Sequence, residues 1–331
     1  FRTKVQAVCG RSRDGKFITG QYRKNSHALV PVRSCALENG KATAIKQTIR
    51  QMATRFNIAP YDEDRDIGDL RHVLIRVGEA TGETLVALVT SKKDFPHKAD
   101  FVSSIHQKNP FVTTIVQIIN RQDTNMVIPE NAEEFVLFGK GYITDIICGL
   151  KFIISAKSFF QTNQKQTERL YSIAMEMARL RPTDRVLDAY SGTGTIGLIA
   201  ASYGVKEVVG VESNSCAVKD AIKNAENNSI TNATFVNADA SKYLKNAKKE
   251  GEKFDIIFLD PPRSGSDEEF LAAASKVDAE GIVYISCNPE TLSRDLRYLT
   301  RFTPYCVLEI QPVDMFPGSS HVETVVLMSR K

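Results

Sequence analysis

Short apolar runs alternate with helical stretches along the second half of the sequence, from about residue 153 onward. The runs that predict strands are 185–189, 207–211, 234–237, 255–259 and 282–285. This alternation is typical of an α/β fold, with a parallel, doubly wound sheet between helices. Two further runs, 306–311 and 322–328, leave no room for a helix between them. We therefore expect an antiparallel hairpin at the edge of the sheet.

The first half of the sequence has a different pattern. Short strands are predicted at 5–8, 17–22 and 28–32, followed by a helix at 42–56, a hairpin of 70–77 with 83–90, a helix at 99–109 and a strand at 112–120. A chain of 331 residues is long enough for two cores. We predict a smaller α+β domain at 1–152 and the α/β domain at 153–331.

Composition excludes several classes of protein. The chain is 42% hydrophobic and 25% charged, as is ordinary for a globular protein. No apolar run approaches the roughly 20 residues that a membrane span needs. The first residues have no signal-peptide core, so a cytoplasmic location is expected. They also lack an initiating Met, which we interpret as the sign of a fragment or a processed form.

Positive charge is concentrated at the front of the chain. Residues 1–60 hold twelve Lys or Arg against Asp14 and Glu38, a balance of +10, which with a total of +4 leaves −6 for the remainder. A basic region of this kind favours binding to a polyanion such as a nucleic acid. The alternative is an ordinary solvated surface with a chance cluster of charge.

Cysteine spacing gives no self-contained metal or redox motif. None of the six cysteines forms a Cys-x-x-Cys pair, and without a secretory signal reduced thiols are expected. Most are predicted to be small buried hydrophobic residues. Cys287 differs, because it stands just after the predicted strand 282–285, within Ser286-Cys-Asn-Pro289.

A glycine-rich turn, Ser191-Gly-Thr-Gly194, follows the first strand of the α/β region and opens a helix. Glycines permit close approach of a ligand, and the helix N-terminus offers unpaired N–H groups. Glu212 ends the next strand, where a carboxylate can bind ribose hydroxyls. S-adenosylmethionine fits because it has a ribose and no phosphates. An NAD enzyme or a non-binding α/β domain is the alternative.

Three polar residues are expected at the same edge of this sheet. Asp260 and Cys287 follow adjacent parallel strands, and Glu323 begins a strand that runs the other way. A thiolate that adds to C6 of uracil makes C5 nucleophilic, so that C5 can take a methyl group before a base removes its proton. The set therefore favours a covalent pyrimidine methyltransferase with Cys287 as nucleophile and Glu323 as base. Alternatively, Glu323 is a solvated strand-end carboxylate.

At these residues the chain resembles the S-adenosylmethionine-dependent RNA uracil-C5 methyltransferases, which form 5-methyluridine in tRNA and 23S rRNA. The resemblance rests on the motifs at 159–163, 187–194, 260–265, 286–289, 314–317 and 321–324. It implies a Rossmann-like methyltransferase fold, Cys287 as nucleophile and Glu323 as base. It also implies cofactor contacts at Gln161, Tyr190, Gly192, Glu212 and Asp260. Candidates for substrate binding are Arg263, Asn288 and His321.

The front of the chain, at 1–6 and 26–35, is most similar to the rRNA-directed branch, particularly its Gram-positive bacterial members. Many members hold an iron–sulfur cluster with four cysteines. Cys35 matches the fourth position, and its three partners are not in this sequence, so a cluster is expected only in a longer form. Gly318–Ser320 replaces a His-Thr-type stretch, which puts local substrate contacts in doubt. No other metal site is expected.

The predicted function is C5 methylation of uridine in 23S rRNA, with tRNA as the alternative substrate. A nucleic-acid N-methyltransferase that clamps a base with Asp260-Pro-Pro is a second alternative, but that chemistry needs no thiol and usually has an aromatic residue where Arg263 stands. A non-catalytic RNA-binding protein is the third, and the intact Cys287 and Glu323 argue against it. The sequence predicts no particular protein partner.

Overall fold

The computed structural model describes residues 1–121, 126–129 and 131–331, and the chain divides into two compact units. Unit 1 comprises Phe1–Ile146 and Ile153–Thr162, whereas unit 2 comprises Ile147–Phe152 and Asn163–Lys331. The division thus differs from the single boundary that we expected after residue 152. Two of the boundaries, after Ile146 and after Phe152, fall within the strands β8 (Tyr142–Ile147) and β9 (Leu150–Ser155). These two strands pair with each other in a separate two-stranded sheet.

Unit 1 is built on a seven-stranded sheet with the order β3-β2-β1-β4-β5-β6-β7. Its strands are β1 (Lys4–Arg11), β2 (Phe17–Tyr22), β3 (Leu29–Pro31), β4 (Leu70–Val77), β5 (Thr84–Thr90), β6 (Thr114–Ile119) and β7 (Glu134–Phe138). The expected hairpin of β4 and β5 is confirmed as an antiparallel pair. The parallel pairing of β5 with β6 was not predicted, and α2 (Lys98–Lys108) connects these strands.

The core of unit 1 lies between its sheet and two helices, α1 (Gly40–Arg55) and α2. Apolar residues at helical spacing on α1, including Ile45 and Ile49, pack with strand residues such as Val73. The Asn39 side chain accepts a hydrogen bond from the Lys41 N–H at 2.9 Å and so caps the start of α1. The sequence therefore fixes where this helix begins and which face it buries.

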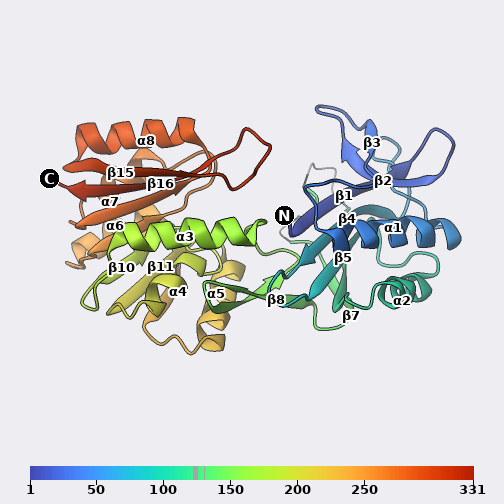
Figure 1. Cartoon of the computed structure of the whole chain (residues 1–331), viewed down its shortest axis with the longest axis horizontal. Coiled ribbons are helices and arrows are strands. Elements are labelled where there is room, and N and C mark those ends of the chain that lie inside the picture. The colour runs from blue at the N-terminus through green and yellow to red at the C-terminus, as the bar shows by residue number, and fades with distance from the viewer. Residues whose placement is uncertain (122–125, 130) are drawn as a thin grey trace. The chain divides into compact units, whose positions relative to one another are not determined.

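Unit 2 confirms the expected α/β fold with a parallel sheet closed by an antiparallel hairpin (Figure 1). Its seven-stranded sheet has the order β12-β11-β10-β13-β14-β16-β15. The strands are β10 (Arg185–Asp188), β11 (Glu207–Glu212), β12 (Ala233–Asn237), β13 (Ile256–Leu259), β14 (Gly281–Ser286), β15 (Tyr305–Val313) and β16 (Glu323–Arg330). The first five pair in parallel, while β16 is antiparallel to both β14 and β15.

Helices cover both faces of the unit 2 sheet. One group packs on one face, namely α3 (Gln164–Ala178), α4 (Thr195–Ser202) and α5 (Ser215–Asn227). The other face holds α6 (Ala240–Lys249), α7 (Glu268–Ala274) and α8 (Pro289–Phe302), whose apolar residues share a core with alternate strand residues. In Figure 1, α8 and α3 lie on opposite sides of β15 and β16. The apolar face of α3 is buried up to Met177, and Leu180 lies beyond the helix end, because the helix stops at Arg179, which adopts a left-handed conformation.

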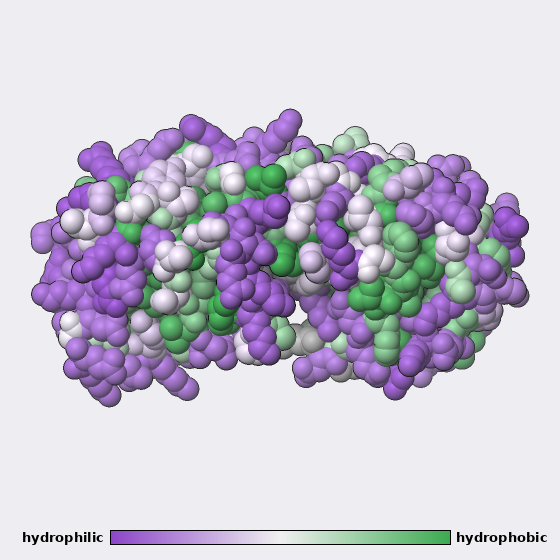
Figure 2. Space-filling view, turned by 90° about the horizontal axis from the view of Figure 1, so that it is seen from below, coloured by the Kyte–Doolittle hydropathy of each residue, from purple (hydrophilic) through white to green (hydrophobic). Residues whose placement is uncertain are grey.

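Hydrophilic residues cover most of the face shown in Figure 2, and hydrophobic ones are exposed in smaller areas between them. Among the described residues, no helix combines the length and the apolar character that crossing a membrane requires.

Candidate active site

The predicted polar residues of unit 2 gather where its strands end. β10 lies between β11 and β13, and the chain leaves it toward β11 first and returns to β13 later, so the strand order reverses there. In open α/β sheets, ligands bind outside the carboxyl ends of the strands at such a switch point. Four residues stand at this edge, each at or directly after the end of a parallel strand: Asp188, Glu212, Asp260 and Cys287.

The glycine-rich turn is bonded to the end of β11. The Gly192 N–H donates a hydrogen bond to Glu212 Oε2 at 3.1 Å, and the Asn214 N–H donates to Oε1 at 2.7 Å. Backbone amides therefore orient the Glu212 carboxylate at the edge of the sheet. Gly194 adopts a φ of +82°, and a Cβ there would lie 2.8 Å from the Phe235 ring, so both conformation and space require glycine.

Two buried oxygen atoms, one in this turn and one at the end of β10, suit a polar ligand. Asp188 is fully buried, and its Oδ2 accepts a hydrogen bond from the Gly197 N–H at 2.8 Å. Burial raises the pKa of Asp188 to about 7, and Glu212 adds to the shift. Within residues 1–121, 126–129 and 131–331, Asp188 Oδ1 and the buried Ser191 Oγ have no hydrogen-bond partner. Buried polar atoms are rarely left unpaired, so these two are suited to a cofactor with donor groups, such as S-adenosylmethionine.

Tyr190 connects this turn to the loop that follows β13. Its ring packs against Phe270 with the centroids 5.1 Å apart, and its hydroxyl lies 3.3 Å from Ser266 Oγ. Burial raises the pKa of Tyr190 to about 12, so the hydroxyl stays protonated at neutral pH. Tyr190 can therefore present an aromatic face and a hydrogen-bond donor at the same edge.

Cys287 lies among three charged side chains. Its thiol is partly exposed, and burial raises its pKa, with contributions in the same direction from Glu323 and Asp260. The exposed Arg263 guanidinium lowers the pKa of this thiol. Burial also raises the pKa of Asp260 to about 8, assisted by Glu323 and Asp188. A thiolate at this position therefore depends on Arg263 and on the protonation of its carboxyl neighbours.

Glu323 reaches the same edge from the antiparallel strand. Ser286 of β14 pairs with Thr324 of β16, so Cys287 and Glu323 each stand one residue beyond this pair. Glu323 is only 4% exposed, and burial raises its pKa to about 7 while Arg263 opposes the shift. It is not the solvated carboxylate that we considered as the alternative. A buried carboxyl with a pKa near 7 can accept a proton from carbon at neutral pH.

The remaining candidates lie in different places. Gln161 lies in the segment Ile153–Thr162 of unit 1, outside α3, whereas the other cofactor candidates belong to unit 2. Asn288 caps α8, since its Oδ1 accepts from the Glu290 N–H at 3.1 Å. His321 is exposed, with its ring edge toward Phe316 at 6.3 Å between centroids.

The motif at 159–163 also has a structural role, through its last residue, Asn163. Asn163 begins α3 as its N-cap, and its Nδ2 donates to the Met315 carbonyl at 3.0 Å. This bond holds the loop that leads into Glu323. Sequence analysis did not foresee it, because Asn163 and Met315 are far apart in the chain.

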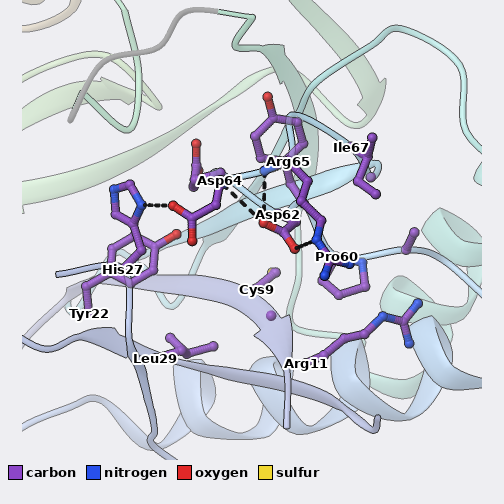
Figure 3. Close-up of a pocket in the computed structure, with 15 residues that line it drawn as sticks. Cys9, Arg11, Tyr22, His27, Leu29, Pro60, Asp62, Asp64, Arg65 and Ile67 are labelled. Atoms are coloured by element: carbon purple, nitrogen blue, oxygen red, sulfur yellow. Dashed lines mark hydrogen bonds and ion pairs between the residues drawn. The ribbon is translucent and has the colours of Figure 1, made fainter. Parts of the chain in front are cut away.

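A separate cavity lies in unit 1 and contains none of the candidate residues. Its volume is about 410 Å³, and Figure 3 shows His27 bonded to Asp64 at 2.9 Å on one side and Arg65 facing Asp62. Glu63 also lines this cavity, and it is ion-paired with the buried Arg71. The lining is rich in carboxylates, which repel RNA phosphates, so we do not assign it to the active site.

No group of three or more His, Cys, Asp or Glu side chains positioned to hold a metal ion occurs among the residues that the structure describes. Cys35 is partly buried and unpaired with any other cysteine.

The fold and the edge of the unit 2 sheet define a Rossmann-like methyltransferase, and comparison with known proteins gives the family. The profile of the tRNA (Uracil-5-)-methyltransferase family matches residues 112–331. An uncharacterized RNA methyltransferase of Halalkalibacterium halodurans is 39% identical over 331 residues, covering 100% of this chain and 71% of the relative. Another, of Clostridium tetani, is 39% identical over 329 residues, covering 99% and 70%. The chain belongs to the S-adenosylmethionine-dependent RNA uracil-C5 methyltransferase family.

Solved structures agree with this assignment. The crystal structure of Pyrococcus abyssi tRNA (uracil-54, C5)-methyltransferase in complex with S-adenosyl-L-homocysteine matches with a TM-score of 0.81 and 26% identity, covering 99% of this chain and 75% of that chain. A putative methyltransferase of Streptococcus mutans shares the fold, with a TM-score of 0.55 and 15% identity over 97% and 91% of the two chains. The protein is therefore an S-adenosylmethionine-dependent RNA uracil-C5 methyltransferase, and the N-methyltransferase and non-catalytic alternatives are not favoured.

Proposed function

We propose that this enzyme methylates C5 of uridine in 23S rRNA, with Cys287 as the nucleophile and Glu323 as the base. The observation that supports this proposal most directly is the pairing of Ser286 with Thr324, because it brings both side chains to the cofactor edge of the sheet. The thiol is partly exposed, so that a substrate ring can reach it, and burial raises the pKa of the Glu323 carboxyl to about 7, which suits a base.

In the proposed reaction, the Cys287 thiolate forms a bond to uracil C6, and the electron pair of the C5–C6 double bond moves to form an enolate. S-adenosylmethionine supplies the methyl group that C5 takes. The Glu323 carboxylate then accepts the C5 proton, the double bond re-forms, and the bond between Cys287 sulfur and C6 breaks. Because the base in a duplex is buried by stacking, the uridine must be in a loop or flipped out.

The charges around Cys287 suit this sequence of steps. A charged Glu323 disfavours the thiolate, whereas Arg263 favours it. Once the sulfur is bonded to uracil C6, it no longer carries a negative charge beside Glu323. The raised pKa of Glu323 then makes its carboxylate a better proton acceptor. We therefore assign Arg263 to stabilising the thiolate and to contacting the substrate.

For the cofactor, we propose contacts with Gln161, Tyr190, Gly192, Glu212 and Asp260. Glu212 is oriented by backbone amides and suited to ribose hydroxyls. Ser191 Oγ and Asp188 Oδ1 supply buried oxygen atoms for further hydrogen bonds. Of the substrate candidates, His321 is exposed and available to RNA, whereas the Asn288 side chain is already engaged at the start of α8.

The choice of 23S rRNA rests on the resemblance of the front of the chain to the rRNA-directed branch, and tRNA is the second candidate. The P. abyssi enzyme of similar structure is a tRNA (uracil-54, C5)-methyltransferase. The basic residues within positions 1–60 support RNA binding by unit 1 but do not distinguish the two substrates. Since the proposed substrate is an RNA, we propose a cytoplasmic location.

The test uses unmodified 23S rRNA and tRNA transcripts with tritium at uridine C5, incubated with S-adenosylmethionine and the protein. Methylation at C5 releases tritium to water. Release with rRNA alone, abolished by Cys287→Ala, is expected. Release with tRNA alone overturns the substrate, and release that persists in Cys287→Ala overturns the nucleophile. Binding of S-adenosylmethionine to the protein is measured separately by calorimetry.

A further inference from the structure

A buried carboxylate on α8 has no role in the mechanism described so far. Asp295 is 1% exposed, yet it faces the interior of unit 2. Its Oδ2 accepts hydrogen bonds from the Ser266 N–H at 2.8 Å and from the Tyr284 hydroxyl at 2.6 Å, and its Oδ1 accepts from Arg294 Nε at 2.8 Å. A buried charge is costly unless it is bonded in this way, so the arrangement ties three chain segments together.

The same face of α8 bonds to the loop that follows β13. Asn288 Nδ2 and Thr291 Oγ1 donate to the Arg263 carbonyl at 3.1 and 3.2 Å. One turn further, Arg294 donates to the carbonyls of Ser264 at 2.9 Å and Ser266 at 3.0 Å. Residues three and four positions apart share a helix face, so these side chains form one continuous contact with residues 263–266.

Gly265 shows how closely the loop approaches this carboxylate. Its φ is +75°, and a Cβ would lie 2.6 Å from Asp295 Oδ2 and 2.7 Å from Arg294 Nη2. Both the conformation and the space therefore require glycine. The loop is held against Asp295 by backbone contact, which leaves it little freedom to shift.

This loop carries residues of both the proposed cofactor site and the proposed catalytic site. It begins at Asp260 and carries Arg263, while Ser266 Oγ lies 3.3 Å from the Tyr190 hydroxyl. α8 itself begins two residues after Cys287. Asp295 is thus linked through Ser266 and α8 to the segments that carry Cys287, Arg263 and Tyr190. We assign it no contact with the reacting atoms.

We propose that Asp295 is a positioning residue for the methyl transfer: it fixes the loop 260–266 on α8 and thereby holds Arg263 beside Cys287. This inference rests on the proposed function for the role of Cys287. A displacement of about 1 Å in a reacting group can lower a rate by a factor of about 100, so a loosened loop is expected to lower kcat.

The test compares two buried tyrosines of the same sheet. Tyr284 donates to Asp295, whereas Tyr305 donates to the Ala279 carbonyl at 2.7 Å, and both are fully buried. Tyr284→Phe and Tyr305→Phe each remove one hydroxyl group and are expected to lower thermal stability similarly. Only Tyr284→Phe is expected to lower kcat, by about 10- to 100-fold.

A second readout needs no RNA. The rate of Cys287 alkylation by iodoacetamide is followed against pH, with the modified peptide resolved by mass spectrometry. The groups facing this thiol are Glu323, Asp260 and Arg263. Tyr284→Phe and Gly265→Ala are expected to shift the profile toward higher pH, because Arg263 is held less firmly. Arg263→Ala is expected to give the same shift, and Tyr284→Phe to add little to it.

Equal kcat values and equal alkylation profiles for Tyr284→Phe and Tyr305→Phe would overturn the inference and leave Asp295 with a role in stability alone. Failure of the proposed function would look different. Cys287→Ala would then retain C5 methylation, while the alkylation comparison would still report whether Asp295 positions the loop.

Discussion

Cys287 and Glu323 each stand one residue beyond the antiparallel register pair Ser286–Thr324, where β14 ends and β16 begins. The two side chains are separated by 36 positions in sequence, from 287 to 323. They meet because β16 runs antiparallel to β14. The strand reversal at the C-terminal hairpin is therefore what completes the proposed catalytic pair.

Glu323→Gln is expected to trap the covalent complex of Cys287 with RNA. The amide keeps the shape of the carboxyl group but cannot accept the C5 proton, so the methylated adduct forms and does not break down. The complex is measured as a slowly migrating band on a denaturing gel with labelled RNA. The double variant with Cys287→Ala is the control and is expected to give free RNA. Normal turnover by Glu323→Gln would remove this residue from the mechanism.

Stability is expected to decrease as pH rises from about 5 to 8. The folded pKa values of Asp188, Asp260 and Glu323 are raised to about 7, 8 and 7, above their values in the unfolded chain. The folded state therefore binds more protons than the unfolded state in this window, and stability falls as these groups ionise. Each contributes a slope of at most about 1.4 kcal/mol per pH unit.

Asp260→Asn tests this pH dependence. It is expected to raise the urea midpoint at pH 8 and to flatten the slope, because the buried charge is gone. The control is Asp278→Asn at the surface, where hydrogen bonds from Arg330 and Lys248 lower the pKa of the aspartate. Its removal is expected to have no stabilising effect at pH 8. A wild-type midpoint that rises from pH 5 to 8 would contradict the prediction.

Gly194→Ala is expected to destabilise unit 2 more than Gly204→Ala. Both glycines have positive φ, +82° and +78°, so the backbone strain of alanine is similar. A Cβ at 194 would meet Phe235 at 2.8 Å, whereas none of the described atoms lies within 4 Å at 204. We expect about 1 kcal/mol for Gly204→Ala and about 2–4 kcal/mol for Gly194→Ala, measured by urea unfolding. Only Gly194→Ala should also weaken binding of S-adenosylmethionine, and equal effects of the two variants would refute the steric argument.

RNA binding is expected to depend on exposed basic residues in the loops that flank the first three strands. The structure removes Lys46 from this set, because it is 1% exposed and paired with Glu38. The exposed ones include Arg13, Arg23, Lys24 and Arg33. Changing these four to Glu should weaken binding and flatten the dependence of log Kd on log salt, since each phosphate contact contributes a slope of about 0.7–0.9.

The matched control for this charge reversal lies in unit 2. Lys206, Lys219, Lys223 and Lys253 are also exposed, and their change to Glu alters net charge equally. We expect a smaller loss of affinity and a nearly unchanged salt slope, measured by fluorescence anisotropy. Identical effects of the two quadruple variants would show that overall charge, rather than a surface of unit 1, governs binding.

Much of unit 2 was predictable from local patterns. The strands from β10 to β16 and the antiparallel hairpin follow from apolar runs and from the spacing between them. Because parallel strands end at one edge, the positions of Glu212, Asp260 and Cys287 also followed. Glu323 followed once β16 was taken to run in the opposite direction. The roles of these residues stay predictions until the variants are measured.

Unit 1 was less predictable. β7, β8 and β9 were not expected, and the segment 153–162 belongs to unit 1 although the sequence placed it in the second domain. Buried polar contacts explain its assignment: the Thr3 hydroxyl donates to the Thr162 carbonyl at 3.0 Å, and the buried Arg76 donates to the Ser158 carbonyl. These two hydrogen bonds join residues that are 82 or more positions apart in the sequence, so no local sequence pattern predicts them.

The sequence by itself determined the strands of unit 2, its glycine-rich turn, and which polar residues end those strands, because propensity and periodicity are local properties. Only the tertiary structure decided the hydrogen bonds of Asp295 with Ser266 and Tyr284, and the burial that raises the pKa of Glu323. Desolvation and long-range hydrogen bonding depend on which distant segments meet, and that is settled when the sheet and its helices pack together.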